Sequence, residues 1–315
     1  MADGALVEAR GLQVSYGATE AVRTVDFDVA PGEVVGLIGP DGAGKTSTLR
    51  VLAGLLRPSG GAVTVFGAPV WASRRALHHR LGYLAQRFAL YGDLTVDENI
   101  QFFALLNGVP HWHERRDELL RRVGLLPFRA RQAERLSGGM KQKLALACTL
   151  IHSPELLLLD EPTTGVDPVT RREFWSLLGG LVADGLTLLV ATPYLDEAER
   201  CSRVMLMHHG RLVGDDTPAG LRGRLPGRVV EVAASPRGEV TAALQGLGGV
   251  ADITVFGSFL HVRLEGVDDP VAAVAAALQL PGIAVESIRA TPASLEDTFL
   301  YLTRTGTGES RGEAA

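Results

Sequence analysis

Cysteine and lysine are both scarce in this sequence: its 315 residues include two cysteines and three lysines, against 28 arginines. The two cysteines, Cys148 and Cys201, lie far apart in the sequence and have no metal-site or redox spacing. We therefore expect two free thiols, as in a reducing cytosol. Because lysine is so rare here, a lysine inside a recognisable motif is not explained by composition alone.

Long apolar runs are missing as well. No run approaches the roughly 18 residues that a transmembrane helix needs, so we expect no membrane span. The first ten residues, MADGALVEAR, lack the basic and apolar segments of a secretory signal peptide. The formal net charge of −5 gives no electrostatic basis for a nucleic-acid partner. The eight histidines have no zinc-site spacing, so we expect no structural zinc.

The length and the composition are those of a two-domain α/β protein. Hydrophobic residues make up 46% of the chain and charged residues 21%, and 315 residues can bury a sizeable core. We expect a first domain at 5–225, with a helical subdomain at about 90–152, and a second domain at 227–303 after a Pro-Gly turn. Residues 304–315 are rich in Gly, Ser and Glu and predict a disordered tail.

The stretch 34–47, VVGLIGPDGAGKTS, organises the first domain. Its apolar, β-branched start at 34–38 predicts a buried strand, and a helical pattern covers 45–53. Between them the spacing is G-x-x-x-x-G-K-T, the phosphate-binding P-loop. The glycines let backbone N–H groups surround a polyphosphate, and the helix N-terminus adds its positive dipole end. The predicted nucleotide-binding residues are Gly39, Pro40, Asp41, Gly42, Ala43, Gly44, Lys45, Thr46 and Ser47.

Two side chains of the P-loop have predicted chemical roles. Lys45 should reach the β- and γ-phosphates as a positive charge, and Thr46 should offer its hydroxyl to Mg²⁺. The alternative is a glycine-rich turn that matches the motif by chance. The strand before the loop and the helix after it favour the nucleotide site.

Two carboxylates follow the apolar strand expected at 155–159. Asp160 and Glu161 would be costly at the tip of a buried strand unless they have a use. A strand end beside a P-loop is where Mg²⁺ and an attacking water lie. We therefore expect Asp160 to bind Mg²⁺ and Glu161 to orient or deprotonate water. A strand that simply ends in a charged turn is the alternative.

The region between these motifs is predicted to be helical and is rich in arginine. Thr95 and Glu98 have the spacing of a capping box, which predicts that two helices fill 95–124. Its positive charges form either a solvated face with salt bridges or a contact with a membrane partner or anionic headgroups. They are Arg115, Arg116, Arg121, Arg122, Arg129, Arg131 and Arg135.

A long helix is predicted from Ser137, its N-cap, to residue 152. Gly138 and Gly139 in its first turn leave backbone N–H groups open to an anion, although a capped helix with no further role remains the alternative. Asp167 is the predicted N-cap of a later helix, with a proline at its first position. Thr192 and Pro193 are predicted to begin another helix in the same way.

The second domain has its own order of elements. We expect a strand at 229–233, a helix at 240–247, strands at 251–256 and 259–264, a helix at 270–280, a strand at 283–288 and a helix at 294–303. This β-α-β-β-α-β order with one further helix is typical of a ferredoxin-like α+β unit.

Together, residues 5–225 resemble the ATP-binding subunit of an ABC transporter. The resemblance rests on the P-loop, the signature LSGGMKQ at 136–142, LLLLDEP at 156–162 and GVD at 165–167, with Tyr16 and Gln86 at matching places. The segment 291–303, TPASLEDTFLYLT, resembles the end of the accessory domain of ABC-2 type export ATPases, which handle drugs, antibiotics, lipids or polysaccharides. The implied fold is an α/β P-loop NTPase of ABC ATPase type with a helical subdomain, followed by a small α+β ferredoxin-like C-terminal domain.

The resemblance also implies a function. The chain would bind ATP and Mg²⁺, hydrolyse ATP and drive a separate integral-membrane permease from the inner face of the cell membrane. It would pair head to tail with a second ABC ATPase subunit, so that Ser137, Gly138 and Gly139 contact the γ-phosphate of the partner's ATP.

Three further site residues belong to this resemblance. Gln86 would coordinate Mg²⁺ and carry the signal to the permease, so that Lys45, Gln86 and Glu161 form the expected catalytic set. Asp167 would stabilise the opposite ATP site across the dimer. Tyr16 has two open interpretations, because it can stack on the adenine or pack on its own sheet.

One residue departs from the family pattern. A histidine that contacts the γ-phosphate usually stands where this chain has Pro193, which has no side-chain donor. Either the chain's own ATP site turns over slowly while its signature completes a competent site in a different ATPase, or it forms a homodimer in which Glu161 suffices. Asp41, where asparagine is commoner, is a milder change that keeps a capping-competent side chain.

Two other functions compete with an exporter subunit. A soluble ABC ATPase of translation or DNA repair usually has two cassettes in one chain or a long coiled-coil insertion, and this sequence has neither. A nucleotide-binding regulatory module with little turnover is suggested by Pro193 alone.

Overall fold

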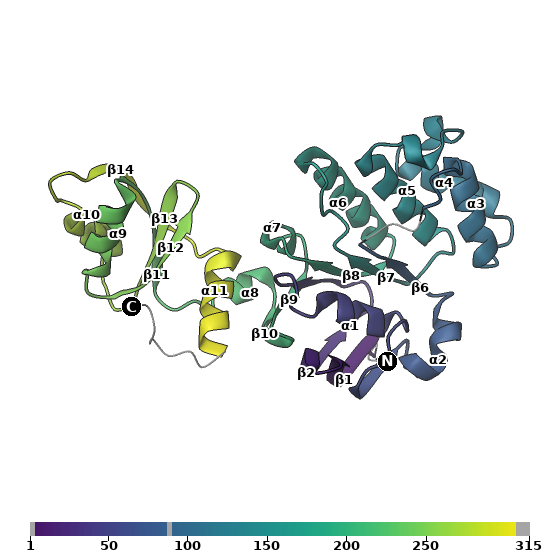
Figure 1. Ribbon diagram of the computed structural model, residues 1–315, viewed down its shortest axis with the longest axis horizontal. Coiled ribbons are helices and arrows are strands. Elements are labelled where there is room, and N and C mark those ends of the chain that lie inside the picture. Colours follow the sequence, from purple (N-terminus) through teal and green to yellow (C-terminus); the bar gives the residue numbers. More distant parts are fainter. Residues whose placement is uncertain (1–3, 87–89, 307–315) are drawn as a thin grey trace. The chain divides into compact units, whose positions relative to one another are not determined.

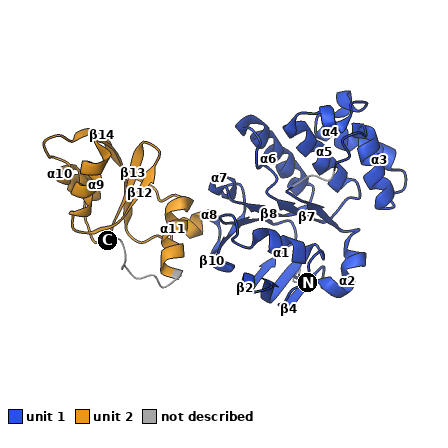
Figure 2. Ribbon diagram, in the orientation of Figure 1, with its two compact units in different colours: residues 1–217 blue, residues 218–315 orange. Residues whose placement is uncertain are grey.

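The computed structural model describes residues 4–86 and 90–306 (Figure 1). The chain divides into two compact units, 1–217 and 218–315 (Figure 2). The first predicted domain ran on to residue 225. The division comes earlier because the short helix α8 (Pro218–Arg222) contacts α11 (Leu295–Gly306) of the second unit.

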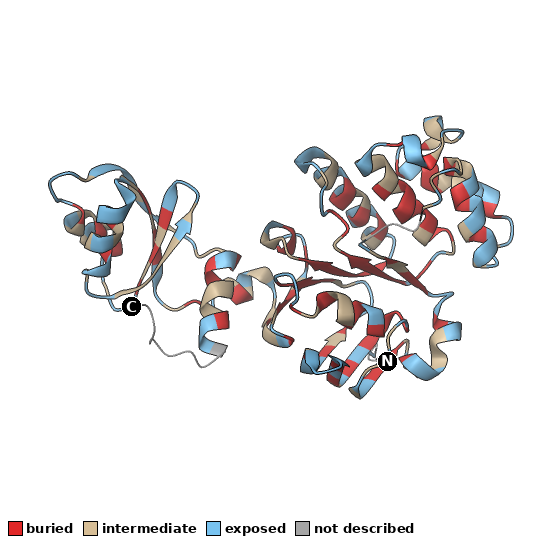
Figure 3. Cartoon of the chain, in the orientation of Figure 1, coloured by how far each residue is buried: buried red, intermediate tan, exposed pale blue. Residues whose placement is uncertain are grey.

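A six-stranded sheet forms the centre of the first unit, with strand order β10-β9-β3-β8-β7-β6. Adjacent strands are parallel from β9 to β6, and β10 is an antiparallel edge. Their bounds are β3 Val34–Ile38, β6 Leu81–Leu84, β7 Leu156–Asp160, β8 Thr187–Thr192, β9 Arg203–His208 and β10 Arg211–Asp216. The central strands β7 and β8 are buried along their whole length (Figure 3), as a parallel sheet covered on both faces requires.

A second, antiparallel sheet has the order β2-β1-β4-β5. Its strands are β1 Val7–Tyr16, β2 Thr19–Val29, β4 Gly60–Val65 and β5 Ala68–Pro69. Helix α1 (Lys45–Leu52) packs between this sheet and the central one and contacts strands of both (Figure 1). One apolar core therefore joins the two sheets and fixes the helix that follows the P-loop.

Helices α5 and α6 cover the opposite face of the central sheet (Figure 1). The helices and short 3-10 turns of this unit are α2 Val70–Leu77, α3 Val96–Leu106, α4 Trp112–Arg122, η1 Leu126–Phe128, η2 Ala133–Arg135, α5 Gly138–Leu150, α6 Pro168–Ala183 and α7 Leu195–Ala198. The capping box of Thr95 and Glu98 is confirmed at the start of α3. Ion pairs hold several of the arginines, such as Arg129 to Asp97 at 2.8 Å and Arg122 to Asp184 at 2.5 Å.

One predicted helix start is wrong. The helix expected from Thr192 and Pro193 begins at Leu195, and Tyr194 is its N-cap. Thr192 is the last residue of β8, and its side-chain oxygen accepts a hydrogen bond from the backbone N–H of Tyr194 (3.1 Å). The threonine therefore closes a local turn instead of capping a helix, because pairing in the sheet already fixes its backbone.

The second unit confirms the ferredoxin-like order. Its sheet is antiparallel with the order β12-β13-β11-β14, and α9 and α10 pack on one face over a core of buried valines and leucines. The bounds are β11 Arg228–Ser235, α9 Arg237–Gln245, β12 Val250–Phe256, β13 Phe259–Leu264, α10 Pro270–Ala277 and β14 Ala284–Thr291. Helix α11 continues to Gly306, so residues 304–306 of the predicted tail are helical. The rest of that tail, 307–315, lies outside the described residues.

The two cysteines are free, as expected, and both are buried. Burial raises the pKa of the Cys201 thiol to about 12 and the pKa of Cys148 still further. Over residues 4–86 and 90–306, no helix has both the length and the apolar character that crossing a bilayer requires.

Candidate functional site

The carboxyl ends of four parallel strands meet at one edge of the central sheet. The P-loop follows β3, Gln86 follows β6, Glu161 follows β7, and Pro193 follows β8. Such an edge is where α/β proteins place their ligands. The backbone N–H of Gly39 donates to the carbonyl of Thr192 (3.3 Å), which brings the start of the P-loop beside the end of β8.

A cavity of about 510 Å³ opens at this edge. It is lined by Thr19, Glu20, Ala21, Asp41, Gly42, Ala43, Gly44, Lys45, Thr46, Ser47, Gln86 and Glu161. Two of the glycines are required by close approach of other backbone. A Cβ at Gly39 would lie 2.1 Å from the carbonyl oxygen of Met207, and one at Gly44 would lie 2.4 Å from that of Ala21. Gly44 also has a φ of +108°, which an L-residue rarely adopts.

Lys45 is a buried charge held inside the loop, with 3% of the residue exposed. Its Nζ donates to the carbonyl oxygens of Gly39 (2.8 Å) and Pro40 (3.0 Å) and lies 3.5 Å from a carboxylate oxygen of Glu161. A buried ammonium is tolerated only with such partners. The lysine is therefore preorganised at the base of the cavity, where an anionic phosphate would compete with Glu161 for it.

Asp160 forms the second part of the site and is 1% exposed. Its carboxylate accepts hydrogen bonds from the hydroxyls of Thr46 (2.9 Å) and Tyr83 (3.1 Å). Burial and the charge of Asp160 raise the pKa of Tyr83 to about 12, so this phenol stays a donor at neutral pH. A carboxylate and a hydroxyl oxygen held side by side are hard oxygen ligands of the kind that Mg²⁺ prefers, so the donor set fits that ion.

Glu161 is held in a strained conformation beside the cavity. Its φ is +50°, in the left-handed region that non-glycine residues seldom occupy. The backbone N–H of Glu161 donates to the carbonyl of Ala191 (2.8 Å) in β8. One of its side-chain oxygens, Oε2, accepts from Gln86 Nε2 (2.7 Å) and from the hydroxyl of Thr164 (3.3 Å). These contacts keep the carboxylate directed at the cavity, where it can orient a water or accept its proton.

The other residues that were predicted to contact a nucleotide lie outside the lining of this cavity. Ser137 caps α5 as predicted, since its Oγ accepts from the N–H of Met140 (3.3 Å), and Asp167 caps α6 by accepting from Val169 and Thr170 (both 3.0 Å). The side-chain hydrogen bond from Thr170 lowers the pKa of Asp167. Within the described residues, the lining of the 510 Å³ cavity includes neither these caps nor Gly138, Gly139 and Tyr16.

Helices α5 and α6 are packed together at their first turns. A Cβ at Gly139 would lie 2.4 Å from Cγ2 of Thr170, so a side chain there would require Thr170 to move, whereas a Cβ at Gly138 would meet nothing within 4 Å. One helical turn later, Lys143 Nζ lies 2.6 Å from a carboxylate oxygen of Glu173. The first-turn N–H groups of α5 have no intrahelical acceptor, and Ser137 and Gly138 are exposed. The N-termini of the two helices, with their positive dipole ends, thus lie together, and only that of α5 leaves N–H groups without an acceptor in its helix.

Tyr16 has 47% of its surface exposed, and its hydroxyl lies 3.3 Å from Ser47 Oγ. The contact places the ring next to the P-loop helix, and stacking on an adenine stays a prediction.

Sequence reasoning missed two side chains of this region. Tyr83 stands in β6 next to β7, and a lone polar aromatic in a short apolar strand was the available signal. Glu197 is fully buried in α7 and accepts a hydrogen bond from the hydroxyl of Thr163. Nothing in the sequence separates it from the exposed acidic residues around it.

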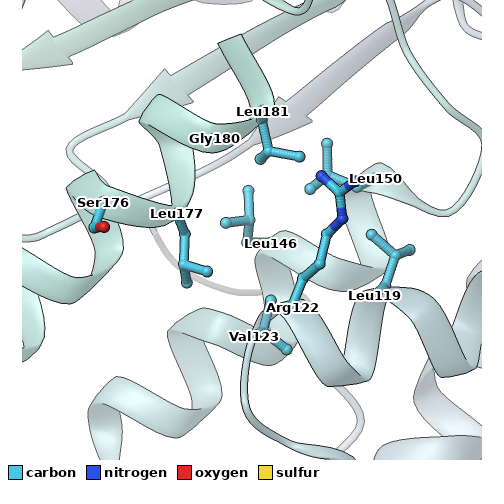
Figure 4. Close-up of a pocket in the computed structure, with 9 residues that line it drawn as sticks. All are labelled: Leu119, Arg122, Val123, Leu146, Leu150, Ser176, Leu177, Gly180 and Leu181. Carbon is cyan, nitrogen blue, oxygen red and sulfur yellow. The ribbon is translucent and has the colours of Figure 1, made fainter. Parts of the chain in front are cut away.

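A second cavity, of about 210 Å³, lies between α4, α5 and α6 (Figure 4). Leucine and valine side chains form most of its walls, and Arg122 reaches along it. This lining lacks the backbone N–H cradle and the carboxylates of the first cavity. The larger, polar cavity is therefore the candidate nucleotide site.

The chain is similar to known proteins over most of its length. A family model described as "ABC transporter" matches residues 22–164. The chain is 38% identical over 308 residues to the daunorubicin resistance ATP-binding protein DrrA2 of Streptomyces coeruleorubidus, covering 96% of each. It is 46% identical over 228 residues to the probable multidrug ABC transporter ATP-binding protein YbhF of Escherichia coli K12, covering 71% of this chain and 39% of YbhF. The chain thus spans well under half of that relative.

A solved structure shares the fold of the first unit. It is described as the dimeric structure of a post-hydrolysis state of the ATP-binding cassette MJ0796 bound to ADP and Pi. The match has a TM-score of 0.61 and 25% identity and covers 67% of this chain and 98% of that one.

Proposed function

Because the chain belongs to the ABC transporter ATP-binding family, we propose that it is the subunit of an ABC-2 type exporter that hydrolyses ATP and drives a separate membrane permease. One observation of the structure carries most of the weight: Lys45 and Glu161 line one polar cavity, and Asp160 accepts a hydrogen bond from Thr46 in the lining of the same cavity, although the P-loop and this pair of carboxylates lie more than 110 residues apart in sequence. The printed names of the relatives, which concern drug resistance and multidrug transport, favour an exporter over a soluble ABC ATPase.

The residues of the cavity divide the hydrolysis between them. The P-loop amides and Lys45 bind the β- and γ-phosphates, and Thr46, Asp160 and Gln86 hold Mg²⁺. The ion, when bound, neutralises charge that develops on the phosphate oxygens. Glu161 orients the attacking water and accepts its proton, held in place by Gln86 and Thr164.

We propose that the two exposed helix N-termini act on the nucleotide of a second subunit. Ser137, Gly138 and Gly139 then contact the γ-phosphate of the partner's ATP, and Asp167 supports the opposite site. The solved dimer of a similar cassette with ADP and Pi supports this arrangement. The second subunit is either another copy of this chain or a different ABC ATPase, and Pro193, which lacks the donor of the usual histidine, keeps the second choice open.

A cluster of exposed apolar side chains suits a membrane partner. Tyr91, Phe102, Leu105 and Leu106 lie on or just before α3 and are between 36% and 69% exposed. Tyr91 and Phe102 contact each other edge to face, with ring centroids 4.6 Å apart. We propose that the permease docks on this apolar cluster and holds the subunit at the inner face of the membrane. The second unit serves as the accessory domain.

The proposal is tested by purifying the chain from detergent-solubilised membranes of cells that express it. We expect Mg²⁺-dependent ATP hydrolysis that a chelator abolishes, and co-purification of a protein with several membrane spans. Co-purification of ribosomes or DNA without a membrane protein would favour the soluble ATPase. ATP binding without hydrolysis in the assembled complex would favour the regulatory module.

A further inference from the structure

Glu197 is a buried carboxylate that the proposed hydrolysis does not use. It lies in α7 and is 0% exposed. One of its oxygens accepts a hydrogen bond from the hydroxyl of Thr163, and Arg171 Nε lies 3.8 Å from the same oxygen. The other oxygen, Oε2, is buried and has no hydrogen-bond partner among the described residues. A carboxylate buried with incomplete pairing costs stability, so its presence calls for a reason beyond folding.

The two partners of Glu197 lie within and shortly after the segment 161–167. Thr163 stands two residues after Glu161 and is 0% exposed. Arg171 stands in the first turn of α6, where its N–H donates to the carbonyl of Asp167 (2.9 Å). One end of this segment thus carries the carboxylate at the chain's own cavity. The other end carries the cap proposed to face the partner's site.

Thr163 belongs to the same tight turn as Glu161. The N–H of Thr164 donates to the carbonyl of Glu161 (3.3 Å), and the N–H of Val166 donates to the carbonyl of Thr163 (3.2 Å). Since Glu161 has a strained positive φ, its direction depends on what fixes the residues after it. The buried hydroxyl of Thr163 is fixed by Glu197.

Arg171 connects the same carboxylate to the residues that follow β8. Its guanidinium lies over the ring of Tyr194, 4.4 Å from the centroid, and Nη1 lies 3.4 Å from a carboxylate oxygen of Asp196. Tyr194 directly follows Pro193. Glu197, Thr163 and Arg171 therefore join three segments of the first unit: the turn after β7, the first turn of α6 and the turn after β8.

We propose that Glu197 is a positioning residue for ATP hydrolysis. By holding Thr163 and Arg171 together, it sets the direction of Glu161 at one end of the segment 161–167 and of the Asp167 cap at the other. This inference rests on the proposed function, because it concerns the rate of the hydrolysis that Glu161 promotes. It does not concern ATP binding, since Glu197 lies outside the lining of the nucleotide cavity.

The test compares Thr163→Val with Thr163→Ser in the full-length chain. Valine has the shape of threonine but lacks the hydroxyl that Glu197 accepts from, and serine keeps it. Misplacement of Glu161 should lower kcat by about tenfold or more in Thr163→Val and leave KM for ATP within about twofold, while Thr163→Ser stays within about twofold in both. Assays run well below the melting temperature of each variant separate this effect from lost stability.

Glu197→Gln is the second variant. It keeps an acceptor for Thr163 but removes the charge that faces Arg171, and we expect a smaller fall in kcat with KM again unchanged. If Thr163→Val does not fold, Glu197→Gln and Arg171→Gln replace it in the test. A lower kcat with an unchanged KM for ATP in these variants supports the inference.

Two results would overturn the inference. One is a kcat within about twofold of wild type in every folded variant that lacks the hydroxyl or the charge. The other is a fall in Thr163→Ser equal to that in Thr163→Val. The proposed function fails separately, if the wild-type chain with its membrane partner does not hydrolyse ATP at all.

Discussion

The P-loop cavity and the paired N-termini of α5 and α6 differ in whether this chain itself supplies the partners of their polar groups. At the cavity, Lys45 and Asp160 are buried; Lys45 donates to carbonyls of its own loop, and Asp160 accepts from Thr46, 114 residues earlier in the chain. At the helix pair, Ser137 and Gly138 are exposed, and the N–H groups of Gly138 and Gly139 have no acceptor within the helix. The charged side chains of the P-loop cavity are therefore held by contacts within this one chain. The paired N-termini of α5 and α6 instead form an exposed surface that a second molecule can contact.

The difference accounts for the two sets of nucleotide contacts that we propose for this chain. The caps of α5 and α6 are aligned with each other by Gly139 against Thr170 and by Lys143 against Glu173. That alignment has no role in a single cavity that does not include them. It has a role if two subunits each contribute one set to a shared site.

Lys45→Ala changes the P-loop cavity and should have the largest effect on ATP binding and hydrolysis. The substitution removes the buried charge at the base of the cavity, and we expect ATP hydrolysis to fall by about 10³-fold, together with weaker Mg·ATP binding. A titration with a fluorescent ATP analogue and a phosphate-release assay measure both. Arg57→Ala, which removes an exposed charge, is the control and should stay within about twofold of wild type. Unchanged binding and hydrolysis in Lys45→Ala would remove the nucleotide site from this cavity.

Glu161→Gln distinguishes ATP binding from ATP hydrolysis in the P-loop cavity. The amide keeps the size of the side chain but is a poor base, so hydrolysis should fall by about 10²- to 10³-fold while Mg·ATP binding persists. Slow hydrolysis should also let an ATP-bound dimer accumulate on size exclusion. Hydrolysis at the wild-type rate would show that another residue is the base.

Pro193→His tests whether the P-loop cavity lacks one hydrogen-bond donor to the γ-phosphate. A histidine after β8 would supply a hydrogen bond to the γ-phosphate, and such a donor is commonly worth about 10²-fold in rate. We expect the variant to hydrolyse ATP at least tenfold faster than the wild type. Equal, brisk rates would favour a homodimer in which Glu161 suffices.

Ser137→Ala and Thr95→Ala form a matched pair of variants that tests the paired N-termini of α5 and α6. Each removes the N-cap of one helix and should lower the free energy of unfolding by about 1 kcal/mol, as denaturant titration would measure. Only Ser137→Ala should also lower the rate of ATP hydrolysis, by several-fold, because only that cap is proposed to contact a nucleotide. Equal rates in the two variants would reduce Ser137 to a structural cap.

The sequence was informative where the signal is local. The glycines and lysine of the P-loop, the caps Ser137 and Asp167, and the order of helices and strands along the second unit all follow from short patterns, and the structure has them in place. A cap or a loop motif constrains its own backbone through neighbours a few residues away, so it can be recognised without the fold.

The missed features depend on residues far apart in the chain. Tyr83 matters because it meets Asp160, 77 residues later, and Glu197 because it meets Thr163, 34 residues earlier. The start of α7 was misplaced because pairing within β8 decides the backbone of Thr192. The positive φ of Glu161 also has no local signal, since the contacts with Ala191 and Gln86 hold it.

The most direct test of the shared site mixes two inactive variants. One chain carries Lys45→Ala, and the other carries Gly138→Asp, which puts a negative charge where the partner's γ-phosphate is proposed to lie. A side chain fits at Gly138, because a Cβ there meets nothing within 4 Å, and an acidic residue in the first turn of α5 does not disturb the helix. Gly138→Ala is the matched control and should keep most of the activity.

Each variant alone should hydrolyse almost no ATP. In an equal mixture, half of the randomly formed dimers are mixed, and each of those has one intact site, so activity should recover to about one quarter of the wild-type rate. A mixture no more active than its two components, in a preparation where this chain is the only ATPase subunit and its wild-type form is active, would contradict a nucleotide site built from two subunits.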